Sequence, residues 1–91
     1  MIMPAGRPAR RDRVLAQEAA GETMLLDLDG GTYFALNEVG ARVWDLCDGN
    51  RSVADIAGAL AAEYEAPEDV IMRDVVELLT ELRAERLVAV D

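Results

Sequence analysis

The first third of the chain carries the short, alternating hydrophobic pattern that is typical of β-strands. Residues 14–19 form one short run, which ends at the turn residue Gly21. Alternation over residues 22–28 brings together one apolar face: Met24, Leu26 and Leu28. The Asp-Gly-Gly stretch that follows, residues 29–31, predicts a tight hairpin turn, because these residues tolerate positive φ. Residues 32–36 are the return strand, so we expect a three-stranded antiparallel meander in the order 1-2-3.

From Asn37 onward the apolar positions recur at helical spacing. Asn37 suits the N-cap of a first helix. Gly49 suits a left-handed cap at the C-terminal end of that helix. Ser52 and Asp55 form a short version of the capping box and predict a second helix. A third and longest helix is expected over residues 67–85, where proline and acidic residues favour the first turn.

The third helix has an apolar arc that is wider than one core contact needs. Its core-facing stripe is predicted to contain Ile71, Val75, Leu78, Leu79 and Leu82. A second stripe of Met72, Val76 and Arg83 runs alongside it, with Leu79 at the boundary. Two interpretations of this second stripe stay open: core filling, or one wall of a binding surface.

The order of elements is therefore β-β-β-α-α-α, which is an α+β class with the second and third helices arranged like a helix-turn-helix pair. We expect a winged-helix-like domain over residues 13–91, with residues 87–90 as a short final strand or a packed tail. Residues 1–12 contain prolines, a glycine and arginines, so a flexible basic tail is favoured over a segment that touches an acidic partner.

Composition removes most catalytic and nucleic-acid-binding alternatives. The 91 residues carry a net charge of −9 and no histidine, and Cys47 is the one cysteine. Triads that use histidine are excluded, and a zinc site would lack its usual ligands, so no cofactor and no metal are expected. Residues 14–91 hold five arginines against 17 acids, a balance that opposes nucleic-acid phosphates, although a winged-helix DNA-binding regulator stays the second hypothesis. An enzyme that uses carboxylates or Cys47 is a third, unsupported by any motif.

No apolar run approaches the length that spans a bilayer, and the first residues lack the apolar core of a secretion signal. A cytoplasmic protein without membrane contact is the expectation.

The last strand of the meander, Thr32 to Leu36, is an edge strand without a charge or a proline to protect it. With the third helix beside it, this edge would form an apolar groove that an extended peptide could enter by strand addition. The alternative use of the same edge is self-association into a homodimer.

Several short motifs, in this order and spacing, resemble the PqqD-like proteins. This family is also called the RiPP recognition elements, where RiPP means a ribosomally made, post-translationally modified peptide. The resemblance covers residues 25–88 and rests on these parts: Tyr33, Leu36 and Asn37 as Y-x-x-L-N; WDLCDG from Trp44 to Gly49; SVADI from Ser52; Tyr64; and D-V-x-x-L-L-x-x-L from Asp74 to Leu82.

The resemblance implies a winged-helix-like domain without catalytic activity. It implies binding of a precursor's leader peptide as an added strand between the third strand and the third helix, and delivery of that precursor to a leader peptidase or other modifying enzyme. The residues expected to carry this binding are Thr32, Tyr33, Phe34 and Ala35 from the strand, and Met72, Val76, Leu79 and Arg83 from the helix. Alternation allows one of Tyr33 and Phe34 to face the groove, and the sequence leaves open which.

Two departures from the family pattern bear on subfamily and local structure. Members that serve pyrroloquinoline quinone synthesis tend to carry a Y-P-E-G turn where this chain has Leu28 to Gly31, so the chain looks more like the stand-alone lasso-peptide type. A chaperone for pyrroloquinoline quinone or another radical-enzyme-modified peptide is the alternative. Members often end in G-L-V where this chain has Arg86-Leu87-Val88, so either Arg86 takes a left-handed conformation or the helix runs further.

Overall fold

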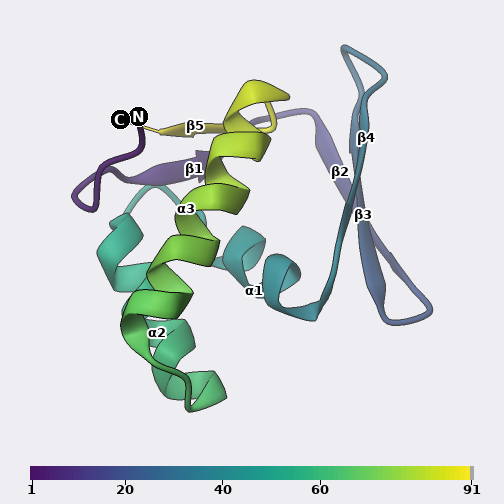
Figure 1. The fold of residues 1–91 in the computed structure, drawn as a ribbon. Coiled ribbons are helices and arrows are strands. Elements are labelled where there is room, and N and C mark those ends of the chain that lie inside the picture. Colours follow the sequence, from purple (N-terminus) through teal and green to yellow (C-terminus); the bar gives the residue numbers. More distant parts are fainter. Residues whose placement is uncertain (91) are drawn as a thin grey trace.

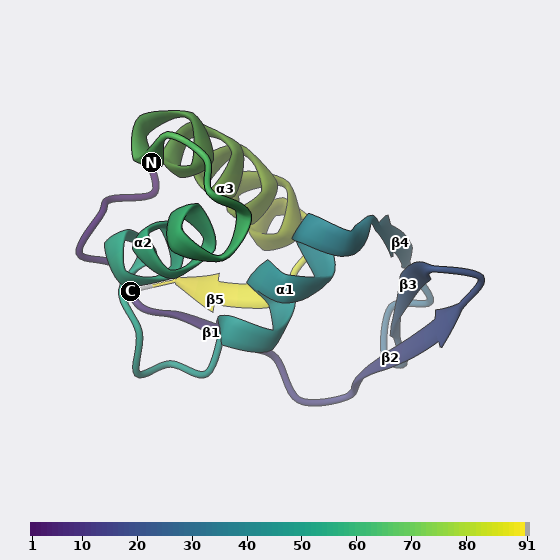
Figure 2. The ribbon, with the colours of Figure 1, turned by 90° about the horizontal axis from the view of Figure 1, so that it is seen from below.

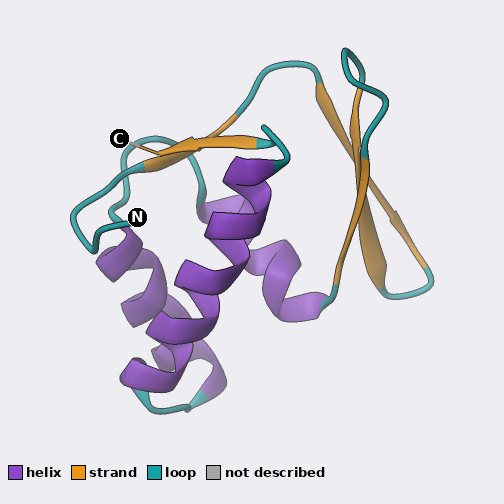
Figure 3. Ribbon diagram, turned by 45° about the horizontal axis from the view of Figure 1, so that its top comes forward, coloured by secondary structure: helices purple, strands orange, loops and turns teal. Residues whose placement is uncertain are grey.

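The computed structural model describes residues 1–90. Its elements are β1 (Pro8–Arg10), β2 (Val14–Ala19), β3 (Glu22–Asp27), β4 (Tyr33–Leu36), α1 (Glu38–Leu46), α2 (Val53–Tyr64), α3 (Glu68–Ala84) and β5 (Val88–Val90). Three helices pack together, with the β2-β3-β4 sheet on one side of them and the β1–β5 pair across the far end of α3 (Figure 1). The predicted α+β architecture of three strands followed by three helices is confirmed, with a two-stranded sheet added (Figure 3).

The main sheet is an antiparallel meander in the order β2-β3-β4, which confirms the predicted strand order. Ala20 and Gly21 both have positive φ and make a tight turn between β2 and β3. The turn between β3 and β4 is wider than the tight hairpin that the sequence predicted. The Gly31 N–H donates to the Asp27 carbonyl at 2.8 Å, and this i to i+4 bond encloses a longer loop.

The two faces of this sheet differ in burial. Leu25 is 0% exposed and Leu36 is 2% exposed, and both belong to the core with the helices. Met24 and Leu28, which share the apolar face seen in the sequence, are 43% and 50% exposed. The core side of β3 is therefore the opposite face, because Leu25 lies beside Phe34 of β4 in the register and packs toward the helices with it.

Helices α1 and α2 begin where their caps predicted. The Asn37 side-chain oxygen accepts the Gly40 N–H at 2.8 Å, and Ser52 and Asp55 make both bonds of a capping box. The core lies between the three helices and the inner face of the sheet, and Trp44, at 5% exposed, belongs to it. Within the described residues, none of the helices combines the length and apolar content that a membrane crossing requires.

Residues 1–12 lie against the domain, whereas their composition favoured a flexible tail. Ile2 is 5% exposed, and β1 pairs with β5 from the other end of the chain (Figure 2). The Arg10 guanidinium donates to the carbonyls of Trp44 and Asp45 at 2.9 and 2.8 Å, which places a cation at the C-terminus of α1. The segment has few apolar residues among its charges and prolines, so its sequence did not indicate burial. Its pairing partner, β5, lies at the other end of the chain, where no local pattern could reveal it.

Helix α3 ends in a Schellman motif with an arginine at its left-handed position. Arg86 has φ of 60°, its N–H donates to the Arg83 carbonyl, and the Leu87 N–H donates to the Leu82 carbonyl. Leu82 and Leu87 are both fully buried, which supplies the apolar contact that usually accompanies this motif. Of the two alternatives left open by the sequence, the structure therefore has the left-handed turn.

Replacing Arg86 with glycine should stabilise the protein. The left-handed conformation costs a non-glycine residue about 1–2 kcal/mol, and the greater chain entropy of glycine offsets part of this gain, so we expect a net increase of about 0.5–1 kcal/mol in the free energy of unfolding. Urea denaturation measures the change. Glu85→Gly is the matched control, because Glu85 has φ of −86° and glycine there should destabilise. A loss of stability in Arg86→Gly would contradict the assigned turn.

Candidate functional site

A cavity of about 430 Å³ lies between β4, α1 and α3. We call it the β4–α3 groove. Its lining residues are Phe34, Ala35, Leu36, Asn37, Val39, Gly40, Val43, Ile71, Asp74, Val75, Leu78 and Glu81. The groove is thus bounded by an edge strand on one side, the first helix beneath, and one flank of the third helix on the other side.

The strand wall offers unpaired backbone groups toward the groove. The Asp27 N–H donates to the Thr32 carbonyl at 2.9 Å, and hydrogen-bonded pairs alternate along an antiparallel ladder. Phe34 and Leu36 therefore bond β3, whereas Tyr33 and Ala35 direct their N–H and C=O groups to the free edge. The bond from the Leu28 N–H to the Arg13 carbonyl fixes the same phase, because the even-numbered residues of β3 then bond β2.

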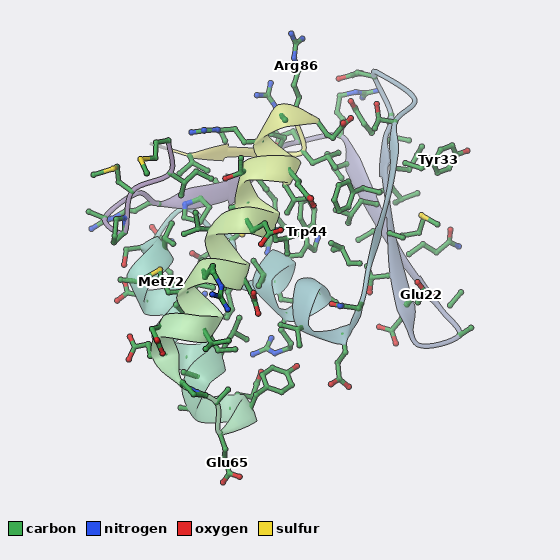
Figure 4. All side chains as sticks on the ribbon, viewed as in Figure 1. Glu22, Tyr33, Trp44, Glu65, Met72 and Arg86 are labelled. Atoms are coloured by element: carbon green, nitrogen blue, oxygen red, sulfur yellow. The ribbon has the colours of Figure 1, made fainter. Side chains whose placement is uncertain are left out.

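The side chains of β4 resolve which aromatic residue faces the groove. Phe34 lines the groove and packs on the core. Tyr33 is 69% exposed and points away from the helices on the outer face of the sheet (Figure 4). Among the strand residues expected from the sequence, Phe34 and Ala35 line the groove, whereas Tyr33 is not one of its lining residues.

The helix wall is a different flank of α3 from the stripe that the sequence favoured. Met72 lies on the side of α3 that faces away from β4 (Figure 4), and Met72, Val76 and Arg83 share that flank at about 100° per residue. Leu79 is 0% exposed and belongs to the core. The lining residues of α3 are instead those at the other edge of its apolar arc: Ile71, Asp74, Val75, Leu78 and Glu81.

Sequence reasoning missed this flank for two reasons. Leu78 fits a core stripe by spacing, yet the structure leaves it partly buried at the groove. Asp74 and Glu81 are exposed acids on a helix, which usually means a solvated surface. The signal that would have found them is their position on the same flank as Leu78, one turn before it and one turn after it.

A second, more polar cavity of about 560 Å³ lies beyond the start of β4. It is lined by Arg11, Asp12, Asp27, Asp29, Gly30, Thr32, Ala84, Glu85 and Arg86. Thr32, the remaining strand residue expected at the site, lies here and not in the β4–α3 groove. In residues 1–90, no group of three or more His, Cys, Asp or Glu side chains is arranged to hold a metal ion.

Cys47 is the one cysteine of the chain, and its surroundings make it inert. It is 0% exposed, and its thiol donates to the Val43 carbonyl at 3.1 Å. Burial raises the pKa of the Cys47 thiol from 9.0 to about 12, although nearby Arg10 lowers it in part. At neutral pH the group is therefore a buried neutral thiol rather than a reactive thiolate.

We expect Cys47 to resist alkylation in the folded protein. At pH 8 a thiol with its pKa near 12 is about a thousandfold less ionised than one with its pKa near 9, so iodoacetamide should label the native protein at least a hundredfold more slowly than the urea-unfolded chain. Because the folded pKa is raised, the related stability is present below pH 9 and is lost as the pH rises toward 12. Equal labelling rates in both states would contradict this environment.

Comparison with known proteins gives a match over most of the chain. The family model described as Coenzyme PQQ synthesis protein D (PqqD) matches residues 22–88. A PqqA binding protein of Bradyrhizobium diazoefficiens is 44% identical over 48 residues, which are 53% of this chain and 47% of that protein. The chain therefore spans about half the length of that relative. A PqqA binding protein of Xanthomonas oryzae pv. oryzae is 37% identical over 82 residues, covering 90% of this chain and 89% of that protein.

Solved structures resemble the whole fold. TbiB1 in complex with the TbiA(beta) leader peptide superposes with a TM-score of 0.77 at 32% identity, covering 88% of this chain and 93% of that one. Lasso peptide synthetase B1 complexed with the leader peptide superposes with a TM-score of 0.79 at 26% identity, covering 91% of this chain and 98% of that one.

Proposed function

The chain belongs to the PqqD family, and we propose on that premise that it binds the leader segment of a ribosomally made precursor peptide and presents it to a partner enzyme. The chain itself supplies recognition and no chemistry. Two of the solved structures that it resembles are complexes with leader peptides, and the curated relatives are PqqA binding proteins. Each of these facts concerns a relative, and the groove of this chain adds support of its own.

One observation carries the proposal: an unprotected strand edge lies beside an apolar cavity. The N–H and C=O groups of Tyr33 and Ala35 can pair with an extended guest, which would extend the sheet to four strands. Every second side chain of that guest would then enter the β4–α3 groove, and the others would lie on the outer face with Tyr33. Backbone pairing gives affinity here, and the groove gives specificity.

The side chains proposed to contact the guest come from all three walls of the groove. Phe34 provides an aromatic surface at the strand, Val39 lies at the start of α1, and Leu78 lies on α3. This helix flank takes the place of the stripe of Met72, Val76, Leu79 and Arg83. A fully buried Leu79 could contact a guest only if the core opened, which would cost the packing of the whole helix.

We favour a lasso-peptide precursor and a leader peptidase as the partners. The loop between β3 and β4 supports this choice because it lacks the Y-P-E-G turn of the quinone-synthesis members. The names of the curated relatives support the alternative, a PqqA-like precursor and a radical enzyme. The genes beside this one distinguish the two: a peptidase with an Asn-synthetase-like cyclase would support the first, and a radical enzyme the second.

Titration of the full chain with the leader of the precursor encoded beside its gene tests the proposed function. Isothermal calorimetry should show one-to-one binding of the leader and none of a scrambled leader of the same composition. Heat signals that are equal for both peptides would contradict specific recognition. Absence of binding to the true leader would overturn the proposal.

A further inference from the structure

We infer that the guest of the β4–α3 groove is cationic, and that it presents lysine or arginine side chains to Asp74 and Glu81 on either side of an apolar side chain that meets Leu78. This inference rests on the proposed function and specifies the chemistry of the peptide that the groove takes.

The charge of the groove has one sign. Of its twelve lining residues, Asp74 and Glu81 are the charged ones, and both are acidic. The ion pairs among residues 1–90 join other side chains, namely Arg13 with Asp29, Arg42 with Asp45 and Glu63, and Arg51 with Asp48. The groove therefore holds two carboxylates that the described part of the chain leaves without a cation, next to an apolar wall.

A guest peptide that covers this wall also removes part of the hydration of these two carboxylates. Removing a carboxylate from water is costly unless a counter-charge or hydrogen-bond donors replace the lost hydration. A guest with lysine or arginine at the matching positions supplies that counter-charge. An acidic guest would place like charges together and would be rejected, so the same two residues give specificity as well as affinity.

Helix α3 sorts its charges between its two flanks. Asp74 and Glu81 lie on the groove flank, whereas Arg83 lies roughly 160° around the helix from Glu81. Arg83 is therefore remote from the groove and cannot neutralise its acids or meet a leader carboxylate there. The polar cavity beyond β4 continues the acidic bias, with Asp12, Asp27, Asp29 and Glu85 against Arg11 and Arg86.

The spacing of the three helix residues matches an extended peptide. Asp74 and Glu81 are two helical turns apart, or roughly 10.5 Å along the axis, with Leu78 between them. Inward side chains of a strand recur about every 6.7 Å, so positions i and i+4 lie roughly 13 Å apart with i+2 in the middle. Long lysine and arginine stems span the difference, and the expected pattern is cation-x-apolar-x-cation.

Selection from a displayed library of random dodecapeptides tests this inference without a known ligand. The library is selected against the full chain, and groove binders are identified as those that lose binding to Ala35→Pro, whose outward N–H is removed. These binders should be enriched in lysine and arginine and depleted in aspartate and glutamate. Against Asp74→Asn/Glu81→Gln the enrichment should disappear, and the best binder should weaken roughly fivefold or more at low salt.

Glu18→Gln/Glu65→Gln is the matched control, because it also removes two negative charges, at exposed positions outside the groove. It should keep both the enrichment and the affinity. Groove binders without cationic enrichment, or enrichment that survives in Asp74→Asn/Glu81→Gln, would overturn the inference and leave the proposed function standing. A selection that yields no binder sensitive to Ala35→Pro would overturn both.

Discussion

Replacing Ala35 with proline should abolish leader binding and leave the fold intact. The Ala35 N–H points to the free edge of β4, so proline removes a bond to the guest and none to β3. The proline ring also projects into the space that the added strand would occupy. We expect leader affinity to fall at least a hundredfold in calorimetry, with a circular dichroism spectrum and urea midpoint close to those of the unchanged protein.

Phe34→Pro is the companion variant, because its N–H belongs to the ladder with β3 and its side chain packs on the core. This substitution should destabilise the fold itself, by about 3 kcal/mol or more. The two variants therefore distinguish the edge of β4 that pairs with β3 from the free edge that would pair with the guest. Full leader affinity in a folded Ala35→Pro would contradict pairing at this edge.

Truncation of two adjacent leucines on α3 should have different consequences: one should mainly lower stability, and the other should mainly weaken leader binding. Leu79 is fully buried, so Leu79→Ala should lower the free energy of unfolding by about 3–5 kcal/mol, a large share of the stability of a small domain. Leu78 is partly buried at the groove, so Leu78→Ala should cost about 1 kcal/mol of stability and weaken leader binding about tenfold. Urea denaturation and leader titration of both variants measure these effects.

Met72→Ala is the control on the far flank of α3. Met72 is partly buried against the core and lies outside the groove lining, so its loss should cost some stability and leave leader affinity within about twofold. A larger loss of affinity for Met72→Ala than for Leu78→Ala would reverse the assignment of the two flanks and restore the stripe that the sequence suggested.

The sequence predicted the helices and strands of this fold because the signals that define them, helix caps and turns, act between residues close in the chain. The Asn37 cap and the capping box of Ser52 and Asp55 each act within one helical turn, and the structure contains both. The meander order also follows from the turns that contain Gly21 and Gly31, both of which have positive φ. The resemblance to the PqqD-like proteins rests on the same spacings, and the comparison with known proteins confirms it.

Features that depend on distant contacts could not be predicted in the same way. The placement of residues 1–12 depends on pairing between Pro8 and Val90, which no local pattern reveals. The flank of α3 that lines the groove depends on how α3 is rotated about its axis against α1 and β4. Helical periodicity shows which residues share a face of the helix, but it does not show which face points toward β4. Leu78 and Leu79 both fit an apolar stripe, and only the packed structure separates the residue in the core from the one at the groove.

Amide hydrogen exchange on β4 tests strand addition most directly. In the free protein the N–H groups of Tyr33 and Ala35 should exchange quickly, whereas the Phe34 N–H, bonded within the sheet, should be protected. A saturating amount of the leader should protect Tyr33 and Ala35 and leave Phe34 protected as the internal reference. Leader binding that leaves Tyr33 and Ala35 exchanging as fast as before would contradict strand addition at this edge.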